Sequence, residues 1–513
     1  MPPPAPHRLP TLTTLLTAAS RHPPCRTLRP RPAPSSPSPR RLTTPASKIG
    51  QPTPDTHPHL LKPGEVTRGI QGTEYAARRA RLVSGLPDGS VVVVAGYGLR
   101  YATQGIFYPF HQNTDLFYLC GVNEPDCALV LEKTTGAGYK MILFVKPTDA
   151  HRVVWDGPRA GLEGAVGFFG ATEARSIDTF QSYLTTLTSP TATRPVYTDL
   201  PLHGPAESIL NNTAKPDPST TSYAFPPRAS TPHPKPNIHP LAPHLTPHRL
   251  LKSRAETALL TTASTITSSA FKAMMRETPL PNTAESDLWA LAEYTARRAG
   301  ASGLAYVPVV AGGVNSLTIH YVVNDQRLRQ GDLVLVDAGA EYASYCADVT
   351  RTWPTSGVFT APQRQLYEAV LRVQKQCVAK CTVESRTSLD AIQRECWDAL
   401  RVEVQKVLGR AVGVREMNTL YPHHVGHYLG LDVHDTFSVS RSTPLQAGMV
   451  LTIEPGLYIP DTAAYPPGLR GVGVRIEDDV LVGGREEGWA AVVLSGGAPK
   501  EVRDVEDCVR GVL

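Results

Sequence analysis

The chain has 513 residues, of which 41% are apolar and 19% are charged, and its formal net charge is +5. This length predicts two or three folded domains, and the composition is that of a soluble globular protein. The small net charge argues against a nucleic-acid-binding surface, and no apolar run reaches the roughly 20 residues that a membrane-spanning helix needs. The eight cysteines lack the spacings of a disulfide framework, which favours reduced thiols in a reducing compartment.

Residues 1–50 have the composition of a targeting segment. They contain Arg, Lys, Ser and Thr but no Asp or Glu, and residues 12–19 fit one short amphipathic helix. This composition is typical of a mitochondrial transit peptide, whereas a secretory signal would need a longer apolar core. It predicts a mitochondrial protein of the matrix, with peripheral attachment to the inner membrane left open. The alternative is a disordered Pro-rich tail, and in both cases the segment lies outside the fold.

Residues 65–202 are predicted to form a mixed α/β domain. Thr73 is expected to cap a helix over 74–86, and the apolar runs 91–94, 127–131 and 141–145 are expected to be strands. Residues 203–249 lose this periodicity and are rich in Pro, Thr and His, which predicts a linker or insertion. Five histidines without ligand-like spacing are interpreted as solvated loop residues: His203, His233, His239, His244 and His248.

Residues 250–513 are predicted to form a second domain, of α+β class, with helices flanking a mostly antiparallel sheet. A capping box of Ser253 and Glu256 opens its first helix. Further helices are expected from Asn282, where Glu285 has the matching offset, to Gly300, from Thr360, and from Ser388 to Gly409. Apolar runs predict strands at 333–336, 449–459 and 474–482.

Carboxylates interrupt the apolar pattern of this second domain at four places. Asp337 ends the strand 333–336, and Asp348 precedes the next one, so a hairpin would bring both to one end of a sheet. Glu454 and Glu477 interrupt the two later strands. Buried like charges are costly unless cations neutralise them. One such residue is commonly part of a salt bridge, but four of them with His427 nearby predict a metal centre.

Two Asp, two Glu and one His form an anionic donor set that consists mainly of oxygen. Such a set suits two divalent ions, for example Mn²⁺, Co²⁺ or Zn²⁺, better than one structural zinc ion. Two ions about 3.5–4 Å apart could activate water and polarise a carbonyl, which is metal-assisted amide hydrolysis. Glu341, between the two aspartates, has no assigned role and is expected to be solvated.

Asp337, Asp348, His427, Glu454 and Glu477, in this order and with their flanking residues, resemble the ligands of the pita-bread metallopeptidases, peptidase family M24. This family includes methionine aminopeptidase, prolidase and aminopeptidase P. The resemblance implies that Asp337 binds one ion, that Asp348 and Glu477 bridge two ions, and that His427 and Glu454 complete the second. It implies two divalent cations, with Mn²⁺ expected and Zn²⁺ or Co²⁺ as alternatives.

The resemblance also implies catalytic roles for five side chains. His320 matches the histidine that meets the substrate near the scissile bond, and Arg475 matches an arginine of aminopeptidase P-like members. His423 and His434 match histidines that bind substrate and stabilise the tetrahedral intermediate. Glu454 is the expected proton acceptor when metal-activated hydroxide attacks the first peptide bond.

The first domain resembles the creatinase-like N-terminal domain of aminopeptidase P, which methionine aminopeptidases lack. The matching elements are Tyr108-Pro-Phe-His-Gln-Asn-Thr-Asp-Leu-Phe-Tyr-Leu119 and Trp155-Asp-Gly-Pro-Arg159. Together with the leader, this favours the mitochondrial aminopeptidase P branch, which includes the fungal intermediate cleaving peptidase. The implied substrates are peptide or protein N-termini, which lose one residue. Cleavage of Xaa-Pro bonds and removal of a bulky first residue both remain open.

Three other functions are alternatives. A prolidase-like dipeptidase is the nearest, because it shares the catalytic residues. A metal-free pita-bread binding protein and a creatinase-like hydrolase are disfavoured, because all five ligands are present. The resemblance is compatible with a soluble monomer or a homodimer. A cut after Arg41 would expose Leu42, a bulky residue of the kind that such an enzyme removes, so self-processing is a hypothesis.

Overall fold

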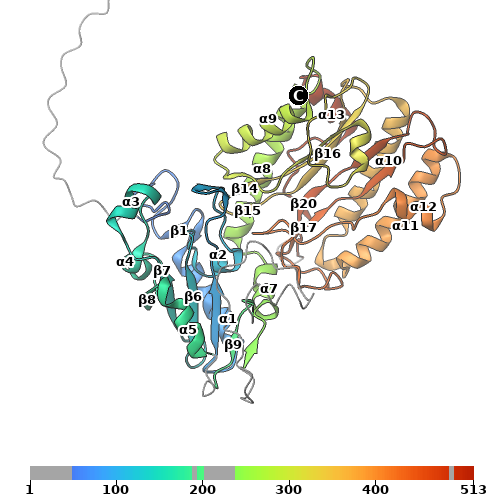
Figure 1. The fold of residues 1–513 in the computed structure, drawn as a ribbon. Helices are drawn as coiled ribbons and strands as arrows, with labels where there is room; N and C mark the ends of the chain where they lie inside the picture. Colours follow the sequence, from blue (N-terminus) through green and yellow to red (C-terminus); the bar gives the residue numbers. More distant parts are fainter. Residues whose placement is uncertain (1–48, 188–192, 202–236, 485–489) are drawn as a thin grey trace, which may run out of the picture. The chain divides into compact units, whose positions relative to one another are not determined.

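The computed structural model describes residues 49–187, 193–201, 237–484 and 490–513, which are coloured in Figure 1. The predicted transit segment and most of the predicted linker, including His203 and His233, lie outside the described residues. Among the helices of the described residues, none has the length and apolarity required to cross a membrane.

The first domain contains a mixed six-stranded sheet. The central pairs are antiparallel and the outer pairs are parallel. The strands lie in the order β10 (Ile238–His239), β9 (Val196–Tyr197), β3 (Val91–Ala95), β6 (Ala128–Lys133), β7 (Tyr139–Val145) and β8 (Glu173–Ser176). Two hairpins lie outside this sheet: β1 (Glu65–Thr67) with β2 (Ile70–Gln71), and β4 (Tyr101–Thr103) with β5 (Ile106–Phe107).

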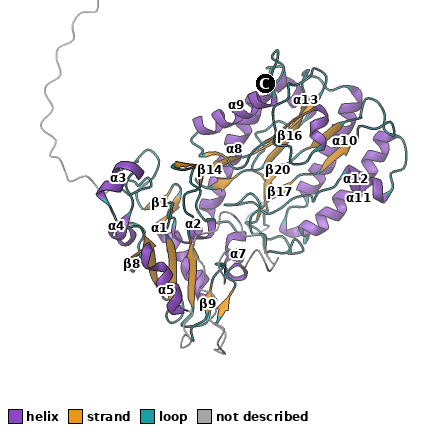
Figure 2. Ribbon diagram, in the orientation of Figure 1, coloured by secondary structure: helices purple, strands orange, loops and turns teal. Residues whose placement is uncertain are grey.

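Helices cover both faces of this sheet, which explains why its strands read as continuous apolar runs. Val92 and Val94 pack in one cluster with residues of α1 and α2, and Val91 and Val93 pack in another with residues of α5. Figure 2 shows these strands in orange among the helices. The helices are α1 (Gly72–Ser84), α2 (Thr114–Cys120), α3 (Ala150–Asp156), α4 (Gly161–Gly167) and α5 (Phe180–Leu187), with a 3-10 turn at Ile177–Thr179.

The predicted cap at Thr73 is wrong. The helix α1 starts two residues before the predicted position 74, at Gly72, and its N-cap residue Gln71 makes no side-chain capping bond. The hairpin β1–β2 leads directly into the helix instead, and the Gly72 amide donates to the Gly64 carbonyl at 3.0 Å. A tertiary contact therefore sets this helix start.

The end of the predicted linker is folded, so the loop interpretation is wrong for residues 237–249. The strand β10 extends the sheet, and α7 (Ala242–Leu250) buries Leu245 and Leu250. His239 stacks on Tyr197, and His244 meets the same ring edge-on. His248 lies in α7 and accepts a hydrogen bond on its carbonyl from the Tyr118 hydroxyl. Two prolines in α7 had hidden the helix in the sequence pattern.

The helices of the second domain largely begin where the sequence predicts. Ser253 and Glu256 form the expected capping box, Thr360 caps with Gln363, and Ser388 caps α11. The second helix is an exception, because Asn282 lies outside it at a φ of 67°. The helices are α8 (Arg254–Glu277), α9 (Glu285–Arg298), α10 (Ala361–Ala379), α11 (Leu389–Leu408), α12 (Val414–Leu420) and α13 (Val502–Val509). Short 3-10 turns occupy Gly313–Leu317 and Val383–Ser385.

The strands of the second domain pair in an antiparallel manner, as predicted. They form four groups: β11 (Gly303–Leu304), β14 (Ala340–Tyr342) and β15 (Tyr345–Cys346); β12 (Val309–Gly312), β13 (Leu333–Ala338) and β16 (Val349–Pro354); β17 (Val450–Ile453), β20 (Asp478–Leu481) and β21 (Val492–Val493); and β18 (Gly456–Ile459) with β19 (Val472–Arg475).

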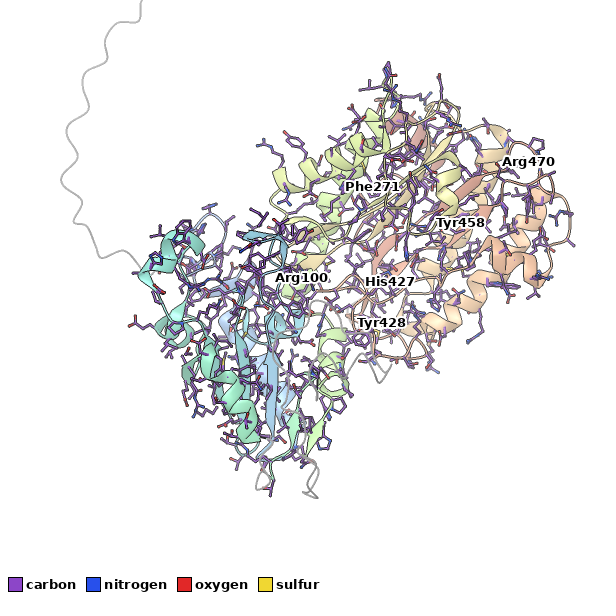
Figure 3. All side chains as sticks on the ribbon, in the orientation of Figure 1. Arg100, Phe271, His427, Tyr428, Tyr458 and Arg470 are labelled. Atoms are coloured by element: carbon purple, nitrogen blue, oxygen red, sulfur yellow. The ribbon has the colours of Figure 1, made fainter. Side chains whose placement is uncertain are left out.

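The main core of this domain fills the space between strands and helices. In Figure 1, β16, β17 and β20 run between the helix pair α8–α9 and the pair α10–α11. Trp353 of β16 is fully buried, meets the ring of Phe271 on α8 edge-on at 6.2 Å, and donates from its indole to Thr278. Phe271 is labelled in Figure 3. The strands that carry the candidate ligands are thereby fixed from both sides.

Candidate metal centre

A closed hairpin brings Asp337 and Asp348 together. Asp337 lies in β13 opposite Thr350 of β16, and Asp348 immediately precedes β16. The short strands β14 and β15 form the loop between them. The chain crosses itself so closely here that a Cβ on Gly339 would collide with the Ala347 carbonyl oxygen. Glycine is therefore needed at position 339 to bring the two carboxylates to one point.

Glu454 and Glu477 lie where strands change partners. Each long strand predicted from the sequence is two strands: β17 and β18 flank Glu454, and β19 and β20 flank Glu477. The strand β17 pairs with β20, whereas β18 pairs with β19. The Glu454 amide donates to Val425 and the Glu477 amide donates to Thr350, so both breaks are themselves hydrogen-bonded. Glu454 and Glu477 therefore lie outside the regular hydrogen-bonding pattern of the strands.

His427 is oriented by its own neighbour. Its Nδ1 lies 3.1 Å from the Tyr428 carbonyl oxygen, which makes Nδ1 the donor there and directs Nε2 toward the carboxylates. Nε2 lies 3.3 Å from Oδ2 of Asp348 and 3.9 Å from Oε1 of Glu454. Figure 3 labels His427 beside Tyr428, within the second domain.

The structure brings all five predicted ligands to one place. Ligand atoms of Asp348, His427 and Glu477 lie within 4.8 Å of one another. Glu454 joins this group through His427. Asp337 joins it through Tyr306, whose hydroxyl lies 2.5 Å from Oδ1 of Asp337 and 2.5 Å from Oδ1 of Asp348.

The electrostatics of this centre favour added positive charge. Burial raises the pKa of Asp337, raises the pKa of Glu454 to about 7, and, with the nearby charge of Asp348, raises the pKa of Glu477 well above its ordinary value. Burial opposes ionisation of Asp348 too, but its hydrogen bond to His427 lowers its pKa and raises the pKa of His427 to about 9. An anionic oxygen-donor set with this deficit of cations fits divalent metal ions.

Arg475 is hydrogen-bonded to groups of the metal centre. Its guanidinium is buried and donates to Oδ2 of Asp337 at 2.6 Å, to the Thr350 hydroxyl at 3.0 Å and to the Tyr458 hydroxyl at 2.8 Å. Thr350 in turn donates to Oε2 of Glu477 at 2.6 Å. These contacts make Arg475 a positioning residue for two of the carboxylates.

Two of the three histidines named from the sequence contact predicted ligands, namely His423 and His434. His423 Nε2 lies 2.9 Å from the Tyr458 hydroxyl and Nδ1 lies 3.7 Å from Oε2 of Glu454. The ring of His434 is exposed and meets His427 edge-on at 4.4 Å. His320 is exposed. Burial and the charge of Arg475 lower the pKa of His423 to about 3, so this imidazole is neutral at physiological pH.

The expectation that Glu341 is solvated is wrong. Glu341 is half-buried, and its Oε2 lies 3.0 Å from Nε2 of His111 in the first domain. This hydrogen bond raises the pKa of His111. The hairpin that carries the two aspartates is thus tied to the motif that resembles aminopeptidase P.

Sequence reasoning missed Tyr306, Tyr458 and Asp479. Asp479 accepts the Asp348 amide at 3.1 Å and the Ser264 hydroxyl at 2.6 Å, and so fixes the backbone of a ligand. Three consecutive acidic residues in an apolar strand, 477–479, were a signal for it. The two tyrosines gave no signal, because aromatic residues are ordinary in strands.

Comparison with known proteins confirms the resemblance inferred from the sequence. Residues 258–483 match the profile of metallopeptidase family M24, and residues 75–197 match the aminopeptidase P N-terminal domain. Xaa-Pro aminopeptidase 3 of Homo sapiens is 41% identical over 476 residues, which cover 89% of this chain and 90% of that protein. The mitochondrial intermediate cleaving peptidase 55 of Arabidopsis thaliana is 36% identical over 460 residues, with 89% and 87% covered.

A solved structure shares both domains. The crystal structure of Icp55 from Saccharomyces cerevisiae, with its N-terminal 58 residues deleted, superposes with a TM-score of 0.75 at 35% identity. The match covers 88% of this chain and 100% of that chain. The fold class inferred from the sequence is thereby confirmed for both domains.

Proposed function

The chain belongs to metallopeptidase family M24, and on this premise we propose that it is the aminopeptidase that removes one N-terminal residue from peptides or imported mitochondrial proteins. The observation that carries the proposal is the convergence of Asp337, Asp348, His427, Glu454 and Glu477 at one point in a domain of this family. The preceding domain matches that of aminopeptidase P, which supports an exopeptidase.

The proposed cofactor is a pair of divalent ions, with Mn²⁺ as the expected metal. Asp337 would hold one ion, His427 and Glu454 would hold the other, and Asp348 and Glu477 would contribute to both. The ions would supply Lewis-acid activation of water and of the scissile carbonyl. Metal analysis of purified protein, with two equivalents per chain expected and one or none contradicting the pair, tests this assignment.

The surrounding residues have distinct proposed roles. Glu454 would accept the proton of the attacking water, and the exposed His434 would donate a hydrogen bond to the developing oxyanion. The neutral His423 does not take the donor role expected for it, because its Nδ1 faces the His424 carbonyl oxygen at 2.9 Å and its Nε2 faces the Tyr458 hydroxyl at 2.9 Å. His320 binds the substrate next to the scissile bond. Arg475 fixes Asp337 and Thr350 through its Nη2 and Nε, so its proposed role is to position the ligands.

The substrate class can be decided by a short panel of peptides. Purified protein with Mn²⁺ would be offered Xaa-Pro oligopeptides, Xaa-Pro dipeptides, and peptides that begin with Leu, Tyr or Phe. Release of one residue from either oligopeptide class supports an aminopeptidase, and the preferred class separates the two specificities. Activity on dipeptides alone would indicate the prolidase-like alternative, and no cleavage at all would refute the enzyme.

The proposed location is the mitochondrion, with the matrix as the compartment and the inner membrane as a peripheral site. The Arabidopsis relative carries the word mitochondrial in its name, and residues 1–50 have the composition of a transit peptide. If the protein trims its own leader after a cut behind Arg41, the mature chain begins at Thr43. N-terminal sequencing that finds Leu42, or a start far from Thr43, would contradict self-processing.

We also propose a homodimer. The hairpin β4–β5 and the residue after it expose Tyr101, Ile106, Phe107 and Tyr108, each more than half accessible. Exposed apolar patches of this kind commonly mark association surfaces. Sedimentation analysis should give twice the chain mass, and conversion to monomer by Phe107→Asp would assign the surface, whereas a monomeric wild-type protein would refute the dimer.

A further inference from the structure

His434 lies in a loop without regular secondary structure. Residues 429–449 form neither helix nor strand, yet the ring of His434 keeps an edge-on contact with His427. Thr436 adopts a φ of 50°, which is costly for a β-branched residue. A strained conformation persists only where the surrounding structure imposes it. Contacts outside the loop must therefore fix the position of His434.

Apolar anchors hold the start of this loop. Leu429 and Leu431 are buried in a cluster that they share with Leu116 and Phe117 of α2. The Cys346 amide donates to the Gly430 carbonyl at 2.9 Å, which ties the loop to β15. These contacts end before His434.

A buried ion cluster holds the residue that follows His434. Asp435, the residue after His434, is 3% exposed, and its two carboxylate oxygens face two cations. Arg249 Nη2 lies 2.5 Å from Oδ1, and Lys252 Nζ lies 2.9 Å from Oδ2. The carboxylate of Asp435 also lies so close to Gly430 that a Cβ at position 430 would collide with it. Gly430 and Asp435, on either side of His434, are thus in close contact.

Arg249 connects this cluster to the first domain. It belongs to α7, in the segment between the two ranges that match known families. Its Nη1 donates to Asp115 of α2 at 2.6 Å and to Thr114 at 3.1 Å, while Nη2 also donates to Asp432 at 2.8 Å. One guanidinium therefore joins α2, α7 and both acidic residues that flank His434.

We propose that Arg249 is a positioning residue that sets the place of His434 over the metal centre through Asp432 and Asp435. The inference rests on the proposed function for its kinetic consequence, but the ordering of the loop by Arg249 does not depend on it. Arg249 acts through His434, so the loss of Arg249 should matter only while His434 is present.

A double-mutant cycle separates this role from general support of the fold. Arg249→Met and His434→Ala would be made singly and together, and kcat and KM would be measured on the best peptide of the panel. We expect Arg249→Met to lower kcat/KM about tenfold in the wild-type background and less than about twofold in the His434→Ala background. Arg249→Lys should restore part of the loss. Equal losses in both backgrounds, or no loss in either, would overturn the proposal.

Hydrogen exchange provides a readout that needs no activity. Peptides that cover residues 428–436 should exchange faster in Arg249→Met than in the wild-type protein. The matched control is Arg78→Met, which removes another buried arginine that contacts α2 and α8 but not this loop. Unchanged exchange of residues 428–436 in Arg249→Met, or equal acceleration in the control, would overturn the proposal.

A substitute variant and a readout that does not depend on activity are available if the first experiments fail. If Arg249→Met does not fold, Asp435→Asn takes its place in both measurements, because at constant size it removes the carboxylate charge that Arg249 and Lys252 share. If the wild-type protein cleaves no peptide of the panel, the proposed function is contradicted, while the exchange measurement still decides whether Arg249 orders the loop.

Discussion

Arg475 donates a 2.6 Å hydrogen bond from Nη2 to Oδ2 of Asp337, and both side chains lie inside the second domain. Burial raises the pKa of Asp337, and the guanidinium opposes that rise. Without bound ions, Arg475 and His427 supply positive charge to the group of four carboxylates. When divalent ions are bound, they also supply positive charge to these carboxylates. The stability contributed by Arg475 should therefore depend on metal.

We expect Arg475→Met to destabilise the chelator-treated protein by about 3–5 kcal/mol, because one partner of a buried pair is removed. The loss should be clearly smaller in saturating Mn²⁺, which binds the folded state and adds its own stabilisation. Urea unfolding with and without metal measures both values. Arg78→Met, which removes a buried arginine away from the centre, should lose the same amount in both conditions. An equal loss in both conditions for Arg475→Met would contradict this coupling.

Asp348 should be the ligand that turnover tolerates losing least. Its carboxylate contacts His427, and Tyr306 links it to Asp337, so its replacement disconnects the two halves of the centre. We expect Asp348→Asn to lower kcat at least about a hundredfold and to reduce the bound metal, since even outer-shell changes cost 10–100-fold. Glu341→Gln, on the same hairpin, is the control and should keep its metal. Asp348→Asn protein with normal activity would refute the assignment.

Local signals in the sequence were sufficient for much of the fold. The capping residues Ser253, Thr360 and Ser388 act within one helical turn, so their positions could be predicted. The carboxylates of the centre were visible because a charge within an apolar strand needs a partner. Each of these predictions used neighbours in the sequence.

The remaining features depend on contacts between distant segments. The strand breaks at Glu454 and Glu477 arise where strands exchange partners, which no local pattern encodes. Tyr306 reaches its aspartates across 31 and 42 residues of sequence. Arg249 was hidden because the Pro-rich composition around it predicts a linker, whereas packing of Leu245 and Leu250 stabilises the helix.

The pair of His111 and Glu341 should give a pH-dependent contribution to stability. The hydrogen bond to Glu341 raises the pKa of His111 in the folded state, so the contribution is complete below the unfolded pKa of about 6.5 and is lost as pH rises through the folded value. The imidazole is half-exposed, so we expect less than about 1 kcal/mol. Urea unfolding of wild type and His111→Asn near pH 6 and pH 9 should show the larger difference near pH 6. In a Glu341→Gln background this pH dependence should vanish, and a larger difference near pH 9 would reverse the assigned sign.

Tyr306 should strengthen metal binding by holding Asp337 and Asp348 together. Burial and the charge of Asp337 raise the pKa of its phenol well above the ordinary value, so it remains a neutral phenol whose single hydrogen is shared between the two carboxylates. Tyr306→Phe removes the hydroxyl and keeps the ring, and we expect Mn²⁺ affinity to fall about tenfold, as for other groups that orient ligands. Calorimetric titration of Mn²⁺ into chelator-treated protein measures this. Tyr321→Phe is the matched control, because that hydroxyl bonds Glu285 away from the centre. Unchanged or tighter binding by Tyr306→Phe would show that its hydroxyl competes with the metal rather than preparing the site.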